Sequence, residues 1–383
     1  MCVRVLIRNH AGVEELRVKY ILLISIFFLF SPVHLSGQVT GPCSDCHTMH
    51  NSQNNALITP TPQDYLLKKT CVGCHTGTNS SGNKTPYVYS TSAPIYNSNT
   101  LAGGNFFWVM SDSGKGHNCL SIPGMPQDSN LSKAPGWHGT GEPTDCQVCH
   151  GSHTGGGMYP EGAHGDCNSC HSQVSSCKTC HKPAHHADDS ANLVGENQGW
   201  YRFLISPNHP DPVTGVKGIE DNDWEFTKSS SDHNEYYGST APGRWADNSM
   251  SHFCAGCHGN FHGIAMSSDT SGGVGHSPWL RHPTYIALPN SGEYKLYNTT
   301  DGSTIGEFSN IAPIARDPSV ISGMSNASAN ITPGSDQVMC LSCHRAHGSP
   351  YADMMRWDYL NGCSAGTQNS NCGCFVCHTA KDD

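Results

Sequence analysis

The sequence predicts a fold that is mostly loop, with short helices and a few short strands, and three observations support this prediction. Apolar residues make up only 36% of the 383-residue chain, which is low for a protein that folds around side chains alone. Glycine and proline, with 41 and 23 copies, interrupt regular secondary structure. The chain also contains 20 cysteines and 24 histidines, so we expect bound groups rather than side chains to organise its core.

The pattern Cys-x-x-Cys-His occurs eight times and uses sixteen of the twenty cysteines. The cysteines are Cys43 and Cys46, Cys71 and Cys74, Cys146 and Cys149, Cys167 and Cys170, Cys177 and Cys180, Cys254 and Cys257, Cys340 and Cys343, and Cys374 and Cys377. The histidines that follow them are His47, His75, His150, His171, His181, His258, His344 and His378. This is the attachment signature of haem c, in which two thiols bond to one haem and the imidazole binds its iron. We predict eight covalently attached haems, stacked as the core of a multihaem cytochrome c fold.

Zinc binding and disulfide formation are the alternative uses of so many cysteines. A zinc site needs paired cysteine motifs, but it has no use for a histidine fixed directly after the second cysteine. A disulfide framework does not need that histidine either. Eight copies with the same histidine therefore favour haem attachment over both.

The N-terminal segment has the pattern of a signal peptide. Arg17 and Lys19 precede the apolar run 20–30, and small residues follow at Ser36 and Gly37. We expect a leader over 1–37, followed by a single elongated octahaem domain over 38–383 with no transmembrane segment. The protein is then exported to the extracellular space or cell surface, or alternatively to the periplasm.

The charge of the chain disfavours nucleic acid as a partner. The full sequence has a net charge of −10, and no stripe of lysine and arginine runs along it. An acidic balance is typical of an exported redox protein, but it leaves the identity of the redox partner open.

The second axial ligand of each iron separates an electron carrier from an enzyme. A histidine on both faces saturates the iron, whereas an open face admits substrate. Fourteen histidines remain outside the motifs and the leader, so eight distal ligands are available. We predict as distal ligands His50, His117, His153, His164, His185, His233, His282 and His347, with His186, His252, His262 and His276 in reserve. Met49, Met110 and Met158 are interpreted as packing residues, and no catalytic residue is assigned.

Three motifs carry a second histidine three residues after the first, at His50, His153 and His347. On a helix such residues lie about one turn apart on similar sides. The second imidazole can therefore reach a neighbouring haem rather than its own, which would build closely stacked haem pairs.

Local signals predict three short helices around the motifs. One opens at Thr61-Pro62 and leads into Cys71, one is capped by Ser335 before Cys340, and a third covers 352–360. Four aromatic segments have strand-like composition, but we expect them to pack on haem faces instead; they cover 87–89, 106–109, 201–205 and 285–288.

Three cysteines of the predicted mature chain lie outside the motifs. Cys363 and Cys372 can close a small disulfide loop in an oxidising compartment or remain thiols. Cys119 then has no intramolecular partner, so it is either buried or joined to a neighbouring molecule.

Several segments resemble the extracellular multihaem cytochromes of metal-reducing bacteria that polymerise into filaments. These segments are 41–52, 115–118, 231–236, 280–284 and 340–348, while the three motifs at 146–181 look like an insertion. The resemblance implies bis-histidine haems in a continuous stack. It also implies that copies of the chain join head to tail, with His50 ligating a haem of the next subunit.

These observations favour long-range electron transfer through an extracellular filament, with other redox proteins or extracellular electron acceptors as further partners. A monomeric carrier, periplasmic or part of an outer-membrane conduit, is the first alternative. The second is an octahaem enzyme acting on nitrite, tetrathionate or hydroxylamine. An enzyme needs an open coordination position, whereas all eight motifs here end in histidine and spare histidines are plentiful.

Overall fold

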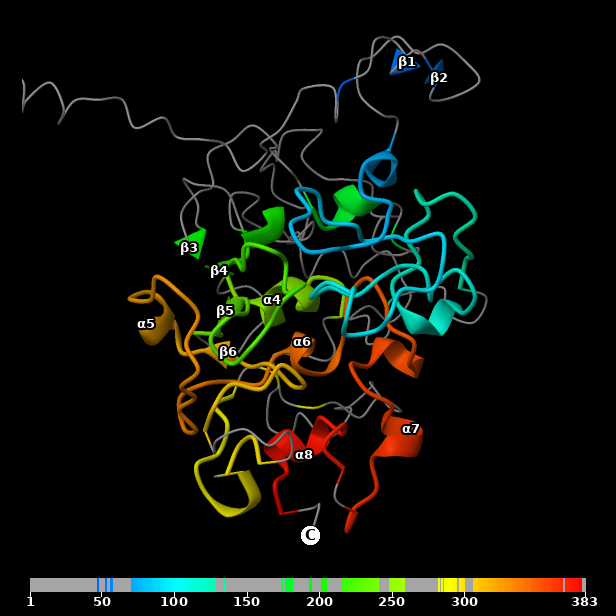
Figure 1. Ribbon diagram of the computed structural model, residues 1–383. Helices are drawn as coiled ribbons and strands as arrows, with labels where there is room; N and C mark the ends of the chain where they lie inside the picture. The colour runs from blue at the N-terminus through cyan, green and yellow to red at the C-terminus, as the bar shows by residue number, and fades with distance from the viewer. Residues whose placement is uncertain are drawn as a thin grey trace, which may run out of the picture. The chain divides into compact units, whose positions relative to one another are not determined.

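The computed structural model divides the chain into two units, Met1–Ser36 and Gly37–Asp383, and everything described here belongs to the second. The structure describes residues 70–128, 176–181, 201–204, 215–240, 248–258, 286–294, 296–299, 306–367 and 369–380, together with 47, 52–53, 56–57, 134, 174, 193–194, 282 and 284. Within these ranges the chain is mostly loop and turn, as predicted (Figure 1).

The helices are short, and five of those described overlap cysteine motifs. The α-helices are α4 (Met250–Ala255), α5 (Pro318–Ile321), α6 (Cys340–Cys343), α7 (Tyr359–Gly362) and α8 (Cys374–Cys377). The 3₁₀ helices are η2 (Cys71–Gly73), η3 (Ser113–Lys115), η5 (Cys177–Thr179), η6 (Tyr201–Phe203), η8 (Gly292–Tyr294) and η9 (Ala352–Met354). The helices that overlap motifs are α4, α6, α8, η2 and η5. No helix within the described ranges is long and apolar enough to cross a bilayer.

Two small sheets contain the described strands. The strands β1 (Ser52–Gln53) and β2 (Ala56–Leu57) form an antiparallel pair. The second sheet has the order β3 (Leu193–Val194), β4 (Gly218–Ile219), β5 (Glu235–Tyr237) and β6 (Ala315–Arg316). Its first two pairings are antiparallel and the third is parallel, with Tyr236 opposite both Gly218 and Ala315. Strands this short position loops rather than build a core.

Buried side chains form three separate hydrophobic clusters, and cysteines of the motifs pack against each one. The first cluster contains Val72, Val109 and Cys119, the second Tyr236, Met250 and Met339, and the third Tyr297, Trp357 and Phe375, each with further members. The motif cysteines at their edges are only half-buried. Each cluster is therefore built around attachment points for haem.

Two of the three predicted helices differ from the structure, and the third lies outside the described residues at 61–69. Ser335 does not cap a helix, because Gln337 pairs with the backbone of Ala315 instead and α6 begins only at Cys340. The segment 352–360 breaks into η9 and the start of α7. The break follows from tertiary pairing, since the Arg356 amide donates to the Cys343 carbonyl.

None of the four aromatic segments forms a strand over its described residues. Tyr89 makes an isolated bridge to Thr76, and Ala287 makes one to Gln337. Residues 106–109 form a turn, and 201–203 form η6. This confirms that the described residues of these segments do not form strands, and their packing on haem faces stays a prediction.

Candidate functional site

Every described motif closes one helical turn in the same way. The histidine amide donates to the carbonyl of the first cysteine, four residues before it. The donor–acceptor distances are 3.0 Å for His75, 2.9 Å for His181, 3.0 Å for His258, 3.1 Å for His344 and 2.9 Å for His378. This turn brings both thiols and the imidazole to one side of the chain, as attachment of a single haem requires. The motifs at 43–46, 146–150 and 167–171 lie outside the described residues.

The rings of four motif histidines are anchored through Nδ1. Three of them donate from Nδ1 to backbone carbonyl oxygens: His75 to Pro86 at 2.9 Å, His181 to Arg202 at 2.7 Å and His344 to Asp353 at 2.9 Å. The Nδ1 atom of His378 lies 3.0 Å from a carboxylate oxygen of Glu293. A hydrogen bond at Nδ1 fixes the tautomer and directs Nε2 toward a metal, the usual arrangement of metal-bound histidine. These motif histidines therefore fit haem, the group that the sequence implies.

Three predicted distal histidines each face one motif histidine. The ring centres are 6.0 Å apart for His181 and His347, 6.1 Å for His117 and His258, and 6.2 Å for His282 and His378. Two imidazoles on one iron place their ring centres about 6 Å apart, because each iron–nitrogen bond is about 2 Å and each centre lies about 1 Å behind its nitrogen. The rings cross at 52° to 90°, which excludes direct stacking.

The environment keeps several of these rings neutral. Burial lowers the pKa of His117 and His181 from the ordinary value, and it lowers the pKa of His347 to about 3. Desolvation disfavours the charged imidazolium, and only the neutral ring can bind iron. Ligand-competent histidine is therefore the default state at these positions.

The two distal candidates His117 and His347 are held at one junction between segments far apart in sequence. His117 Nδ1 lies 2.8 Å from the Ala346 carbonyl oxygen, and the His347 amide donates to Gly103. Gly104 adopts φ +90°, and a Cβ there would lie 2.0 Å from the carbonyl oxygen of Gly348. Only glycine allows the two backbones to approach this closely.

Arg345 secures the same junction and was not singled out from the sequence. Its side chain is buried and donates to the hydroxyl of Tyr96 and to the carbonyls of Leu101 and Ala102, at 2.8 to 3.0 Å. Nothing local marks this role, because all its partners lie more than two hundred residues away. Its position between His344 and His347 is the one available signal.

His233 has a different environment from the other distal candidates. Its Nδ1 lies 3.1 Å from the Ser229 carbonyl oxygen and its Nε2 lies 3.1 Å from a carboxylate oxygen of Glu235. The ring stacks on Phe308, with centres 3.5 Å apart. Glu235 also accepts from the buried Arg316 at 2.6 Å. In this arrangement both ring nitrogens have protein partners, so an iron would have to displace Glu235.

A histidine held in reserve also has a local hydrogen-bond partner. The Nδ1 atom of His252, held in reserve, lies 3.0 Å from the Ser249 hydroxyl. The remaining predicted ligands lie outside the described residues; they are His50, His153, His164 and His185, with His186, His262 and His276 in reserve.

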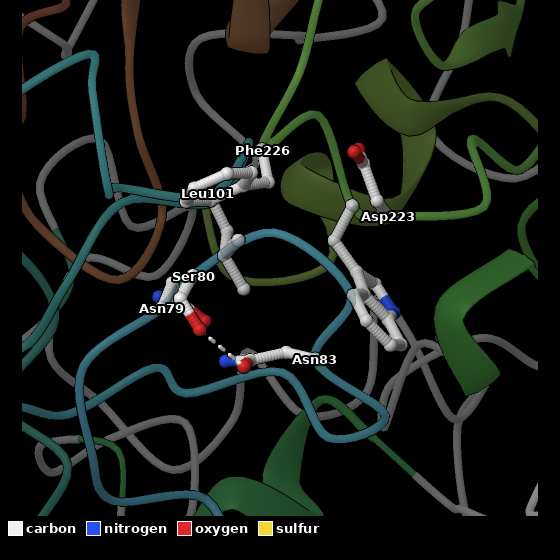
Figure 2. Close-up of a pocket in the computed structure, with 7 residues that line it drawn as sticks. Asn79, Ser80, Asn83, Leu101, Asp223 and Phe226 are labelled. Carbon is white, nitrogen blue, oxygen red and sulfur yellow. Dashed lines mark hydrogen bonds between the residues drawn. The ribbon is translucent and has the colours of Figure 1, made fainter.

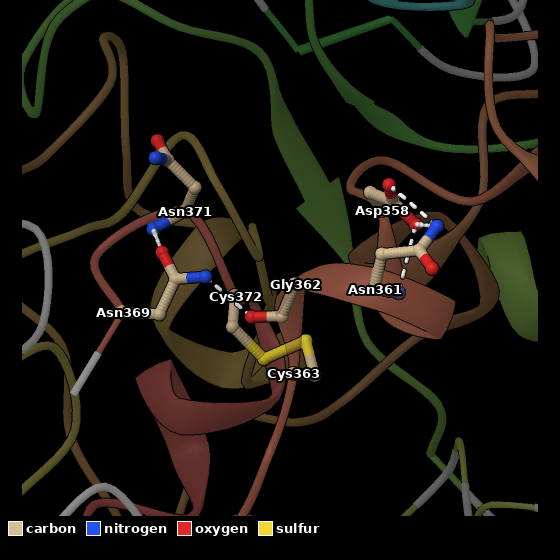
Figure 3. The surroundings of a disulfide bond; sticks show 7 residues. All are labelled: Asp358, Asn361, Gly362, Cys363, Asn369, Asn371 and Cys372. Atoms are coloured by element: carbon tan, nitrogen blue, oxygen red, sulfur yellow. Dashed lines mark hydrogen bonds between the residues drawn. A yellow bond between two sulfur atoms is a disulfide. The ribbon is translucent and has the colours of Figure 1, made fainter. Parts of the chain in front are cut away.

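Cys363 and Cys372 form a disulfide, with Cα atoms 5.4 Å apart and a sequence separation of 9 (Figure 3). The loop is also closed by Asn369, whose side-chain amide donates to the Gly362 carbonyl. The bridge lies directly before α8, and its sulfurs are within 4.8 Å of the Cys374 thiol. It therefore fixes the chain where the last motif begins.

Cys119 is a buried thiol, the first of the two outcomes left open by the sequence. Its sulfur lies 3.7 Å from that of Cys177 and 3.4 Å from the Ser121 hydroxyl. It therefore stands beside a haem-attachment point without being part of a motif.

A small, partly open pocket is lined by residues other than these histidines (Figure 2). Its apolar lining residues are Leu101, Trp224 and Phe226, and its polar lining residues are Asn79, Ser80, Asn83 and Asp223. None of the predicted ligands lines it, so it is separate from the candidate haem sites.

Comparison with known proteins points to the same class of molecule. A family model described as a doubled CXXCH motif matches residues 37–80 and 332–383. The C-type cytochrome OmcS of Geobacter sulfurreducens is 23% identical over 359 residues, which cover 82% of this chain and 78% of that protein.

Two solved structures of filaments from Geobacter sulfurreducens are also similar to this chain. The Outer Membrane Cytochrome S filament matches with 19% identity and a TM-score of 0.43, and the OmcS nanowire matches with 20% identity and a TM-score of 0.45. Both alignments cover 91% of this chain and 93% of the other.

Proposed function

We propose that this multihaem c-type cytochrome carries electrons over long distances through eight bis-histidine haems, as an exported protein that polymerises into extracellular filaments. The haems, when attached, supply the reversible iron couple that holds and releases electrons. The chain itself binds the haems, orients their ligands and sets how closely they approach one another.

The observation that carries the proposal is the pairing of motif histidines with distant histidines at about 6 Å. We assign His347 as the second ligand of the iron bound by His181, His117 as that for His258, and His282 as that for His378. An iron held between two imidazoles has no open position for substrate, so this arrangement favours electron transfer over catalysis.

The pairing of His347 with His181 also supports the predicted use of the His-x-x-His motif. His347 lies three residues after its own motif histidine, His344, yet its ring faces a different motif. By the same logic His50, three residues after His47, is proposed to ligate a haem of another copy of the chain. Such a head-to-tail contact is heterologous and generates an open filament. The similarity to OmcS supports this assembly.

Electron microscopy of protein sheared from intact cells tests the proposal. We expect thin helical filaments in which every ferric haem is low-spin. The variant His50→Ala should lose the filaments while keeping its covalent haems. Discrete particles from the unaltered chain would indicate a monomeric carrier instead of a filament. A high-spin haem that binds nitrite or hydroxylamine would indicate an enzyme.

A further inference from the structure

We infer that five haem-attachment segments form one continuous series, in which segments 71–75 and 177–181 are direct neighbours although they lie far apart in the sequence. The order is 71–75, 177–181, 254–258, 340–344 and 374–378. The inference rests on the proposed function and deepens it, because it names the route that electrons follow. In the sequence, two further motifs stand between the first two members of the series.

The first link joins segments 71–75 and 177–181. Val72 is buried in a hydrophobic cluster against which Cys177 packs. Cys119, a buried member of the same cluster, has its sulfur 3.7 Å from that of Cys177. The Leu120 amide donates to the Val174 carbonyl at 3.0 Å, so the chain leading into Cys177 is tied to the same cluster.

The second link joins segments 177–181 and 254–258. Cys180 and Cys254 pack against one cluster, which contains the buried side chains of Tyr201 and Met250. The histidine of segment 177–181 is also tied to this region, because Nδ1 of His181 donates to the Arg202 carbonyl, 2.7 Å away. Segment 177–181 therefore contacts one cluster through its first cysteine and the next cluster through its second.

The third and fourth links extend the series to the last motif. Helices α4 and α6 lie side by side (Figure 1), and Cys254 of α4 packs with Leu341 of α6 against the same cluster. Cys343 then packs with Cys374 and Cys377 against the cluster that contains Trp357 and Phe375. Segment 340–344 therefore also bridges two clusters, one through each end of its turn.

These contacts determine the order of the haems because each motif sulfur is bonded to the edge of its own porphyrin. Where two segments pack against one cluster, the edges of the two attached groups are brought close together. The route therefore passes from 71–75 directly to 177–181.

An iron map of the haem-loaded chain tests the order directly. We expect the irons bound by His75, His181, His258, His344 and His378 to follow one another with no other iron between them. Another iron between two consecutive members, or a different order, would overturn the inference. The map can be read from monomers as well as filaments, so its outcome is independent of whether the proposed polymer forms.

Discussion

His117 Nδ1 lies 2.8 Å from the carbonyl oxygen of Ala346, the residue directly before His347. Two histidines that we propose as distal ligands, and that face different motif histidines, are therefore fixed by a single backbone junction. A change in that junction should affect two irons together rather than one.

The variant Gly104→Ala should disturb both of these irons. A Cβ at this position would lie 2.0 Å from the Gly348 carbonyl oxygen, so the segment carrying His347 must move. We expect a part of the ferric haem signal to change from low-spin to high-spin, measured by electron paramagnetic resonance. Gly82→Ala is the matched control, because Gly82 also has a positive φ of 79° but has nothing within 4 Å of its Cβ position. An unchanged spectrum in Gly104→Ala would argue against the junction.

The variant His347→Ala should open one coordination position on the iron bound by His181. We expect one haem to become high-spin, with its reduction potential raised, while covalent attachment is kept. Added imidazole should restore the low-spin spectrum, which a purely structural defect would not allow. If the spectrum stays entirely low-spin without imidazole, the assignment of His347 is wrong.

His233→Ala should behave differently, because the ring of His233 hydrogen-bonds to Ser229 and Glu235 and stacks on Phe308. Burial opposes ionisation of Glu235, but hydrogen bonds from His233 and Arg316 outweigh it and lower the pKa of that carboxyl. Loss of the ring should reduce the free energy of unfolding by about 2 kcal/mol or more while every haem stays low-spin. Chemical denaturation and the spin-state spectrum check this together. If one haem instead becomes high-spin, and added imidazole returns it to low-spin, then His233 is a ligand after all.

Asp221 should make stability depend on pH. Burial and the neighbouring Asp223 raise the pKa of this carboxyl to about 7. A carboxyl whose pKa is raised on folding stabilises the protein most below its unfolded pKa, and this contribution is lost as the pH rises through about 7. Between about pH 4 and 7 the free energy of unfolding should fall with rising pH, by at most about 1.4 kcal/mol per unit from this group. Urea unfolding across this range should show a weaker dependence in Asp221→Asn, and identical slopes would contradict the prediction.

Counting the cysteines that react with an alkylating agent tests haem attachment, the disulfide and removal of the leader together. Sixteen motif cysteines should be thioethers and Cys363 and Cys372 a disulfide, so the unfolded mature chain should alkylate only at Cys119. Reduction should add Cys363 and Cys372. Peptide mapping by mass spectrometry would locate any further labelled cysteine and thus identify a motif without haem.

The same disulfide should have a measurable effect on stability. Closing a loop of this length stabilises a protein by about 2 to 3 kcal/mol through the entropy of the unfolded chain. The double variant Cys363→Ser, Cys372→Ser should lose about that much free energy of unfolding. A change well below this in urea denaturation would mean that the haem at α8 already constrains the loop.

The sequence by itself determined the chemistry of this protein. The fixed spacing of Cys-x-x-Cys-His is local, and each described copy folds as the same single turn, so its function is readable without tertiary information. The low apolar fraction and abundant glycine likewise predicted a loop-rich chain with short helices. Helix starts were less predictable. A helix was expected to begin after Ser335, but the backbone of Gln337 pairs with that of Ala315 instead.

Only the tertiary structure decided which residues meet. Nothing in the sequence pairs His117 with His258 or His347 with His181, because these contacts depend on segments that lie far apart along the chain. His233 resembled other distal candidates in sequence, yet its Glu235 and Phe308 contacts give it a different environment. Local spacing specifies how a haem is attached, whereas the packing of remote segments specifies its second ligand and its neighbour.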